Sequence, residues 1–489
     1  MKSNNVINLF HKKISTKEKQ RFGILCVLYL VAISAILRAN FNYIDDLGRV
    51  YRGYKKWENF SRYLSNFLSN FIHADPYLSD VSPLPQCIAV VLLVIASMVF
   101  LYTVFGKDTF SIWTVAALFP LGLSPYFLEC IVFKYDSPYM ACAVLFSILP
   151  LIWKEKSVIS YGIAIVLGIV GTCTTYQAAL GFFPTIVVLV AFKEWNEGKP
   201  IKFVLKDIVV AAGAYLVALL LFMKVIMQPV TENYINPTMP SAEELIPVVI
   251  DNYRIYFNNI LTDHKTEWLV LIAVLLCCFC GTTIVNTKRH KIVALGSAVV
   301  SLMMMALLCF GVYPFMTEPS FVPRAMIGFG IFLTALGGYC VQSRKTLFLS
   351  KIACFALSWC FFVFAFTYGN ALYQQKEYTD FRIQQVITDL NDITSFDTET
   401  KTHIQIENSI AQSPIIAKHP KDYKMLKKLI PNTFGNTFWA SYELMYYYGI
   451  DNIVRDTTLD LRTMNLPIVV DTVHHRIRAD KEHILIELK

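Results

Sequence analysis

The sequence predicts a polytopic α-helical membrane protein that ends in a small mixed α/β domain. Of its 489 residues, 55% are hydrophobic and 16% are charged, whereas soluble domains carry roughly 25% charged residues. The mean hydropathy is +0.47. Apolar runs reach or approach the roughly 20 residues that cross a hydrocarbon core about 30 Å thick. The runs end near residue 369, and a more polar region, 370–489, follows.

The apolar windows predict about eleven transmembrane helices within residues 22–369. Three windows, 109–124, 138–153 and 178–192, are shorter than a full span, so we expect some of them to be tilted, re-entrant or extended by buried polar residues. The windows are 22–39, 86–106, 109–124, 138–153, 157–173, 178–192, 207–228, 267–285, 292–312, 324–341 and 347–369.

The basic residues predict the orientation. Residues 1–21 hold six lysines and arginines before an apolar run without a small-residue cleavage site, which is typical of an uncleaved signal anchor with a cytoplasmic N-terminus. Alternation from there makes every inner loop basic and leaves 370–489 outside, which is the periplasm if the chain lies in a bacterial inner membrane. The net charge of +8 follows from these loops and does not indicate nucleic acid. The inner loops contain Lys107; Lys154 and Lys156; Lys193, Lys199, Lys202 and Lys206; Lys288, Arg289 and Lys291; and Arg344, Lys345 and Lys351.

The region 370–489 predicts a periplasmic α/β domain. It opens with a helical stretch, Ala371 to Leu390, and continues with a β-type run, His403 to Glu407. Two apolar-rich strand patterns, Pro467 to Thr472 and His483 to Leu488, are separated by a polar turn and predict a closing hairpin. The region contains no recognisable catalytic motif.

No cofactor is indicated by the sequence. The twelve cysteines lie in or beside apolar windows, none beyond Cys360, and their spacing does not resemble a zinc site. Walker, Rossmann and HExxH motifs are absent from the sequence. We therefore expect no cofactor and no obligatory metal, with a divalent ion left open, and a donor that the membrane delivers.

The first outer loop, residues 40–85, contains two adjacent acids. Apolar residues after Asp46 recur at helical spacing with basic residues between them, which predicts an amphipathic helix on the membrane surface. Asp45 or Asp46, at the headgroup level, is suited to accept a proton from a sugar hydroxyl, and Arg49 lies on the same helical face. The alternative is an Asp helix cap with a local ion pair to Arg49.

A second outer loop, Ser124 to Pro138, embeds Glu129, Lys134 and Asp136 among aromatic residues. Ionisable residues at this depth usually face a cavity and pair with one another. Lys134 is therefore a candidate phosphate ligand or a structural partner of the two acids. Arg324 opens a later window after Val-Pro, and its guanidinium matches phosphate geometry.

Several outer segments together resemble a known family, the phage-type serotype-converting glucosyltransferases of the type II family, which modify bacterial O-antigen. The resemblance implies a GT-C-like architecture, catalysis on outer loops, and polyprenyl-phosphate-glucose as donor to a lipopolysaccharide acceptor. The segments are I-D-D-L-G-R (Ile44 to Arg49), G-Y-K-K-W and S-R-Y-L after it, D-V-S-P-L-P-Q (Asp80 to Gln86), S-P-Y-F-L-E (Ser124 to Glu129), K-Y-D-S (Lys134 to Ser137), T-Y-Q (Thr175 to Gln177) and P-R-A (Pro323 to Ala325).

The resemblance also implies residue roles within a catalytic membrane domain. Either Asp45 or Asp46 is expected to be the general base, and the choice between them stays open. A single inverting displacement without a covalent nucleophile is expected. Phosphate-binding roles carry over to Arg49, Lys134 and Arg324, and sugar- or acceptor-binding roles to Glu129, Asp136, Tyr176 and Gln177.

Other functions fit part of the pattern. A transporter or flippase of lipid-linked sugars also needs many spans and buried charges, but inverted repeats are not evident and the acids gather on outer loops. A structural scaffold would not need acids beside bases on several outer loops. The identity of the sugar, its linkage and the acceptor rest on the resemblance alone.

Overall fold

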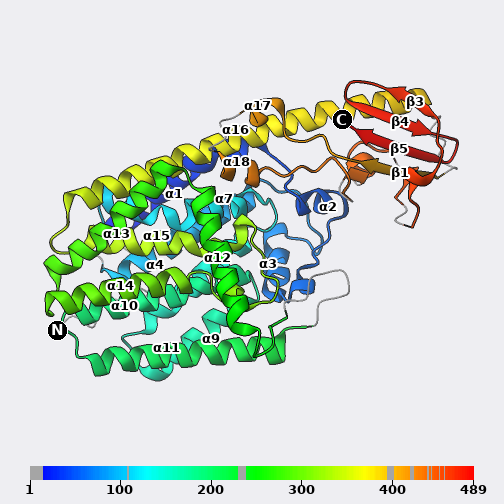
Figure 1. The fold of residues 1–489 in the computed structure, drawn as a ribbon. Coiled ribbons are helices and arrows are strands. Elements are labelled where there is room, and N and C mark those ends of the chain that lie inside the picture. Colours follow the sequence, from blue (N-terminus) through cyan, green and yellow to red (C-terminus); the bar gives the residue numbers. More distant parts are fainter. Residues whose placement is uncertain are drawn as a thin grey trace.

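The computed structural model describes residues 15–106, 110–228, 238–393, 401–418, 423–437, 440–441, 443–450, 452–455 and 458–489. It is a bundle of long helices with a β-sheet beyond one end, and the long helix α16 runs from the bundle to the sheet (Figure 1). Lys2, Lys12, Lys13 and Lys107, which contributed to the predicted orientation, lie outside the described residues.

Each predicted apolar window contains helix. Continuous apolar sequence satisfies its backbone polar groups internally only as helix in a membrane. The elements are α1 (Thr16–Ala39), α4 (Leu84–Val104), α5 (Ile112–Leu118), α6 (Pro120–Leu123), α7 (Pro125–Val132), α8 (Ser137–Ile148) with η4 (Leu149–Trp153), α9 (Val158–Cys173), η5 (Gln177–Gly181) with α10 (Phe182–Asn196), α11 (Ile201–Leu221) with η6 (Phe222–Ile226), α13 (Thr266–Asn286), α14 (Lys291–Leu308), α15 (Gly328–Gln342) and α16 (Phe348–Ile393).

The chain is a multi-pass membrane protein. Among the described residues, seven helices are long and apolar enough to cross a membrane, or up to eight if the pair Ile112–Leu123 and Pro125–Val132, bent by 57°, is one span. The helices Ser137–Trp153, Val158–Cys173 and Gly328–Gln342 are shorter. The predicted count of eleven is therefore not confirmed.

The loops gather at two opposite ends of the bundle. At one end, Arg289 donates hydrogen bonds to the carbonyl oxygens of Trp195 (3.0 Å) and Lys199 (2.6 Å), which joins two loops predicted to be cytoplasmic. At the other end, Leu64 N donates to Thr174 O (3.1 Å), which joins two loops predicted to lie outside. The predicted alternation of loops is thus compatible with the bundle.

The spacing predicted an amphipathic helix in the first outer loop, but the loop does not form one continuous helix. It forms α2 (Asp45–Arg52), the 3-10 turn η2 (Trp57–Phe60) and α3 (Tyr63–His73). Gly53 ends α2 with φ +60, and a Cβ there would approach Leu78 O to 3.0 Å. Trp57 is buried (2% exposed), so the loop folds onto the bundle, while the aromatic side chains of Phe60, Phe67, Phe71 and Tyr77 remain exposed.

Helix α12 (Leu245–Asp263) was not predicted from the sequence. It follows α11 and precedes α13 in the chain, and its exposed face is mixed, with Ile246, Ile250 and Leu261 beside Asp251 and Arg254. Its buried Tyr256 stacks on Phe310 with 4.4 Å between ring centroids and contacts Phe321 at 4.8 Å. Aromatic packing at one face therefore holds α12 against the bundle, close to the segment that contains Arg324.

The C-terminal region forms a five-stranded sheet in the order β2-β1-β5-β4-β3. The predicted hairpin between 467–472 and 483–488 is wrong, because β4 lies between these strands and pairs antiparallel with both. Its alternating burial gives His475–Ala479 a strand pattern of its own. The strands are β1 (Thr402–Glu407), β2 (Ile453–Val454), β3 (Ile468–Asp471), β4 (His475–Ala479) and β5 (His483–Leu488), and the short helices are α17 (Pro414–Ala417), α18 (Lys424–Leu429) and η9 (Glu443–Tyr447).

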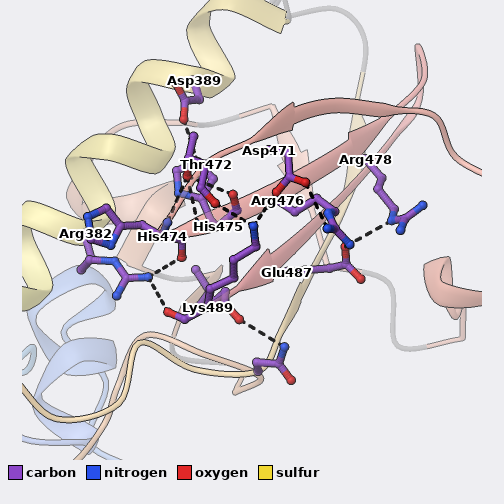
Figure 2. Close-up of polar contacts among 12 residues, drawn as sticks. Arg382, Asp389, Asp471, Thr472, His474, His475, Arg476, Arg478, Glu487 and Lys489 are labelled. Atoms are coloured by element: carbon purple, nitrogen blue, oxygen red, sulfur yellow. Dashed lines mark hydrogen bonds and ion pairs between the residues drawn. The ribbon is translucent and has the colours of Figure 1, made fainter.

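Helix α16 joins the sheet to the bundle. In the bundle, a Cβ at Gly369 would lie 2.4 Å from Ala35 C, so only glycine allows this approach of α16 to α1. Beyond the bundle, the buried Arg382 of α16 donates to the carbonyl oxygens of His474 (2.5 Å) and Lys489 (3.0 Å). Figure 2 shows these contacts beside the Asp389–His475 pair at 2.7 Å. The predicted helix Ala371 to Leu390 is thus part of α16, which positions the sheet.

Candidate active site

Segments that are far apart in the sequence meet at the end of the bundle that bears α2 and α3 (Figure 1). The segments are the turn between α1 and α2, the buried helix α7, the short helix η8 (Pro323–Ala325) and α18 from the C-terminal region. Two of these, α7 and η8, contain the candidate residues Glu129 and Arg324, and the turn leads directly to Asp45.

Glu129 of α7 fixes Arg324 of η8 by two hydrogen bonds. The carboxylate accepts from Arg324 Nη1 at Oε1 (2.6 Å) and from the backbone N–H of the same residue at Oε2 (2.6 Å). The side chain of Glu129 is 3% exposed, whereas that of Arg324 is 29% exposed. The acid therefore lies behind the guanidinium and orients it, which is how a preorganised cation is built.

A cavity of about 390 Å³ opens beside this pair. Its walls combine aromatic and aliphatic side chains with two cations and one acid, which suits a ligand that has both an apolar and an anionic part. The lining residues are Tyr43, Ile44, Glu129, Phe321, Val322, Pro323, Arg324, Lys428 and Pro431.

Asp45 directly follows Ile44, a residue that lines the cavity. Ile44 lines the cavity and has φ 45 and ψ −97, a backbone conformation that a β-branched residue rarely adopts. Backbone strain of this kind persists only where the surrounding structure enforces it, and it is concentrated at functional sites. The strained residue makes Asp45 the first residue of α2, where this carboxylate is only partly buried.

Asp46 has a different environment from its neighbour. It is fully buried, and its Oδ2 accepts the backbone N–H groups of Tyr43 (3.1 Å) and Lys134 (3.0 Å). Burial raises the pKa of Asp46 to about 7, although the charge of Arg49 and the two N–H groups act in the opposite direction. Asp46 thus ties the first outer loop to the second and is not accessible to a substrate.

Arg49 forms its ion pair with an acid of the second outer loop and not with an acid of α2. It is 5% exposed, forms an ion pair with Asp136, and lies 4.7 Å from the ring centroid of Trp57. Trp57 Nε1 also donates to Asp136 Oδ1 (2.5 Å). The alternative of an Asp cap with a local Arg49 ion pair does not describe this arrangement, because Ile44 is the N-cap residue.

Lys134 lies at a second, smaller cavity. Its Nζ donates to Asn42 Oδ1 (2.7 Å) and to Asp80 Oδ2 (3.2 Å), and burial lowers its pKa against the opposing effect of Asp80 and Asp46. Lys134 is therefore paired with Asp80 and not, as considered from the sequence, with Glu129 and Asp136, whose partners are Arg324 and Arg49. The cavity, of about 210 Å³, is lined by Ile36, Leu37, Asn40, Phe41, Ser82, Pro83, Gln86, Val132 and Lys134.

Tyr176 and Gln177 form hydrogen bonds with Arg324 and Arg62, respectively. The hydroxyl of Tyr176 donates to the backbone oxygen of Arg324 (3.0 Å). The amide oxygen of Gln177 accepts from Arg62 Nε (3.0 Å), and the guanidinium of Arg62 lies 4.8 Å from the Tyr176 ring centroid. Neither predicted residue lines the 390 Å³ cavity. Tyr176 bonds to Arg324, which lines the cavity, whereas the partners of Gln177, Arg62 and the backbone oxygen of Phe60, do not.

The sequence analysis missed the contribution of the C-terminal region. Lys428 of α18 lines the cavity and forms an ion pair with Asp263 of α12 at 3.1 Å. The next residue, Leu429, accepts hydrogen bonds at its backbone oxygen from Tyr43 (2.9 Å) and Tyr368 (3.2 Å). The basic run K-M-L-K-K-L has no motif that would have identified it, so only the fold reveals this proximity.

Within the part of the chain that the structure describes, no group of three or more His, Cys, Asp or Glu side chains could hold a metal ion. The expectation that no metal is obligatory stays a prediction. Buried ion pairs and hydroxyl groups supply polar atoms to the described site.

Comparisons with known proteins identify the family of the chain. The family model described as "Glucosyl transferase GtrII" matches residues 9–335, more than half of the chain. The chain is also 23% identical over 458 residues, 88% of its length and 91% of the relative's, to an uncharacterized 55.3 kDa protein encoded in the gtrB 5′ region of Salmonella phage P22. No solved structure matches it. Because the family model covers most of the helical bundle and the segments that carry Asp45, Glu129 and Arg324, the chain belongs to the glucosyl transferase GtrII family.

Proposed function

We propose that this transferase moves a hexose, expected to be glucose, from a polyprenyl-phosphate-linked donor to a hydroxyl group of an envelope glycan such as O-antigen. The observation that carries the proposal is the 390 Å³ cavity. It is lined by Arg324, which Glu129 orients, and by Ile44, the residue before Asp45. Membership of a glucosyl transferase family supports glycosyl transfer. The relative from a Salmonella phage supports a role in serotype conversion.

The proposed location is the periplasmic face of the inner membrane, on a GT-C-like scaffold. Two features support it. The candidate site lies at the end of the bundle opposite the loops that contain Lys199 and Arg289, and basic loops are retained on the cytoplasmic side. The multi-pass helical architecture provides a lipid-linked donor with direct access from the bilayer.

Asp45 is the proposed general base. The oxygen of the acceptor hydroxyl attacks the anomeric carbon while its proton moves to the Asp45 carboxylate. The bond between the anomeric carbon and the phosphate oxygen breaks, and its electron pair goes to the lipid phosphate, which Arg324 binds. The displacement inverts the anomeric centre and needs no covalent nucleophile. Asp46 is instead a positioning residue, because it is buried and bonded to backbone N–H groups.

The remaining predicted residues receive supporting roles in this mechanism. Glu129 orients Arg324 and borders the sugar site. Arg49 and Asp136 hold the first outer loop against the second as an ion pair. Lys134 neutralises Asp80 at the smaller cavity.

The test is an assay with purified full-length protein in nanodiscs, an undecaprenyl-phosphate-hexose donor and lipopolysaccharide as acceptor, read by mass spectrometry. The wild type is expected to add a hexose increment. Asp45→Asn is expected to lower the rate by roughly 10²- to 10⁴-fold, the contribution of a general base. Asp75→Asn, an exposed acid in the same outer loop, is the matched control and should transfer normally.

Two results would overturn the proposal. A wild-type chain that adds no hexose from the lipid-linked donor would remove the proposed reaction and favour transport of the lipid-linked sugar. Full activity of Asp45→Asn would remove the base assignment.

A further inference from the structure

The C-terminal region contributes one wall of the cavity, although the matched family segment ends at residue 335. Helix α18 does not pack with the sheet. Its buried Leu426 and Leu429 belong to the same apolar core as the membrane helices, whereas the strands pack in a separate core with the end of α16. The chain therefore leaves the bundle along α16 and returns to it at α18 before it completes the sheet.

Two ion pairs at this cavity share the same design. Glu129 and Arg324 are 2.6 Å apart, with side-chain exposures of 3% and 29%. Asp263 and Lys428 are 3.1 Å apart, with side-chain exposures of 5% and 31%. In each pair the acid is buried and the cation remains about one-third exposed, and both cations line the same cavity.

Lys428 is held in place from several sides. Asp263 also accepts a hydrogen bond from the buried Tyr126 (3.1 Å), so its carboxylate is itself anchored in the bundle. The hydroxyl groups of Tyr43 and Tyr368 both bond to Leu429 O. An ammonium that is oriented by a buried acid and by a pinned backbone is preorganised for an anionic ligand.

We propose that Lys428 is a second cationic ligand for the phosphate of the lipid-linked donor. This inference rests on the proposed function and deepens it. The donor is a phosphodiester with one negative charge, and the leaving group is a phosphomonoester that approaches two. Arg324 compensates the single negative charge of the bound donor. Lys428 compensates the additional negative charge that develops on the phosphate as its bond to the anomeric carbon breaks.

The charge argument predicts a specific kinetic effect. An interaction that strengthens as charge develops stabilises the transition state more than the bound donor, so it changes kcat more than KM. Loss of one such preorganised contact typically costs roughly 10²- to 10³-fold in kcat. Inhibition by the product, undecaprenyl phosphate, should weaken as well, because the product carries the developed charge.

The experiment compares Lys428→Met with Lys424→Met, a matched change at an exposed lysine of the same helix. Full-length protein in nanodiscs is assayed for kcat, donor KM and inhibition by undecaprenyl phosphate. Lys428→Met is expected to lose roughly 100-fold in kcat with a much smaller change in KM, and Lys428→Arg is expected to recover much of the rate. Lys424→Met should match the wild type.

A paired variant guards against simple misfolding. Lys428→Met leaves the buried Asp263 without its cation, so the double variant Lys428→Met with Asp263→Asn removes both charges together. It is expected to fold and to show the same loss in kcat. Wild-type kcat in either folded variant, or a loss confined to KM, would overturn the inference while the proposed function stands. An inactive wild type would instead overturn the proposed function and the inference with it.

Discussion

Removing the Asp46 carboxylate is expected to destabilise the outer end of the molecule by an amount that depends on pH. In Asp46→Ala, the buried N–H groups of Tyr43 and Lys134 lose their acceptor. An unsatisfied buried donor costs about 1–3 kcal/mol, so two cost about 2–6 kcal/mol. Asp46→Asn keeps an oxygen at the same place and is expected to cost about 1 kcal/mol or less.

The sign of the pH dependence follows from the raised pKa. Burial lifts the pKa of Asp46 from 3.8 to about 7 in the folded protein. Between pH 3.8 and about 7, Asp46 is therefore protonated in the folded chain but ionised in the unfolded chain. The protonation of Asp46 contributes fully to the free energy of unfolding below about pH 4, and this contribution is lost as the pH rises through about 7. At 1.36 kcal/mol for each pH unit, this amounts to about 4 kcal/mol. The deficit of Asp46→Ala relative to the wild type should therefore be largest near pH 5 and smaller at pH 8.

The assay is a denaturant titration in mild detergent, followed by the intrinsic fluorescence of the seven tryptophans. Wild type, Asp46→Ala, Asp46→Asn and the exposed control Asp75→Ala are compared at pH 5, 6, 7 and 8. Equal midpoints for wild type and Asp46→Ala at pH 5 would refute the role of Asp46 as the acceptor that joins the two loops. A deficit that grows toward pH 8 would refute the raised pKa.

Two further predictions concern the ion pair between the outer loops and the orientation of the chain. Asp136→Asn leaves the buried Arg49 without its counter-charge and is expected to cost about 3–5 kcal/mol in the same titration, whereas an unchanged midpoint would mean that the pair contributes no net stability. A phosphatase that is active only in the periplasm is expected to be active when fused after Lys489. An active cytoplasmic reporter at that position would instead place the C-terminal domain on the inner side.

The sequence was sufficient to locate the helices of the membrane domain, because hydrocarbon permits little else. A long apolar run has to satisfy its own backbone, and every predicted window contains helix. Helix α12 escaped notice because its stability comes from the packing of residues such as Tyr256 and not from a long apolar run. The break at Gly53 was missed for a related reason, because it depends on the contact with Leu78, which local periodicity does not report. Strand β4 is a different case: its partners β3 and β5 are its neighbours in the chain, and its five residues alternate in burial, so its pattern was present in the sequence.

The candidate site divides in the same way. The sequence identified Asp45, Asp46, Glu129 and Arg324 as exceptional, because charged residues in apolar surroundings are costly and are retained for a reason. It did not identify their partners. Glu129 and Arg324 are 195 positions apart, and Asp263 and Lys428 are 165 apart. With 44 basic and 36 acidic residues in the chain, charge alone allows many pairings.

The different environments of Asp45 and Asp46 could be decided only by the tertiary structure. Neighbouring residues of a helix point in directions about 100° apart, since one turn holds 3.6 residues. The second outer loop packs against the face that bears Asp46 and buries it against the Lys134 N–H. Asp45 remains partly accessible beside the cavity wall. The sequence determined that two acids lie where the first helix meets the outer loop, and the packing of the second outer loop determined which of the two remains accessible.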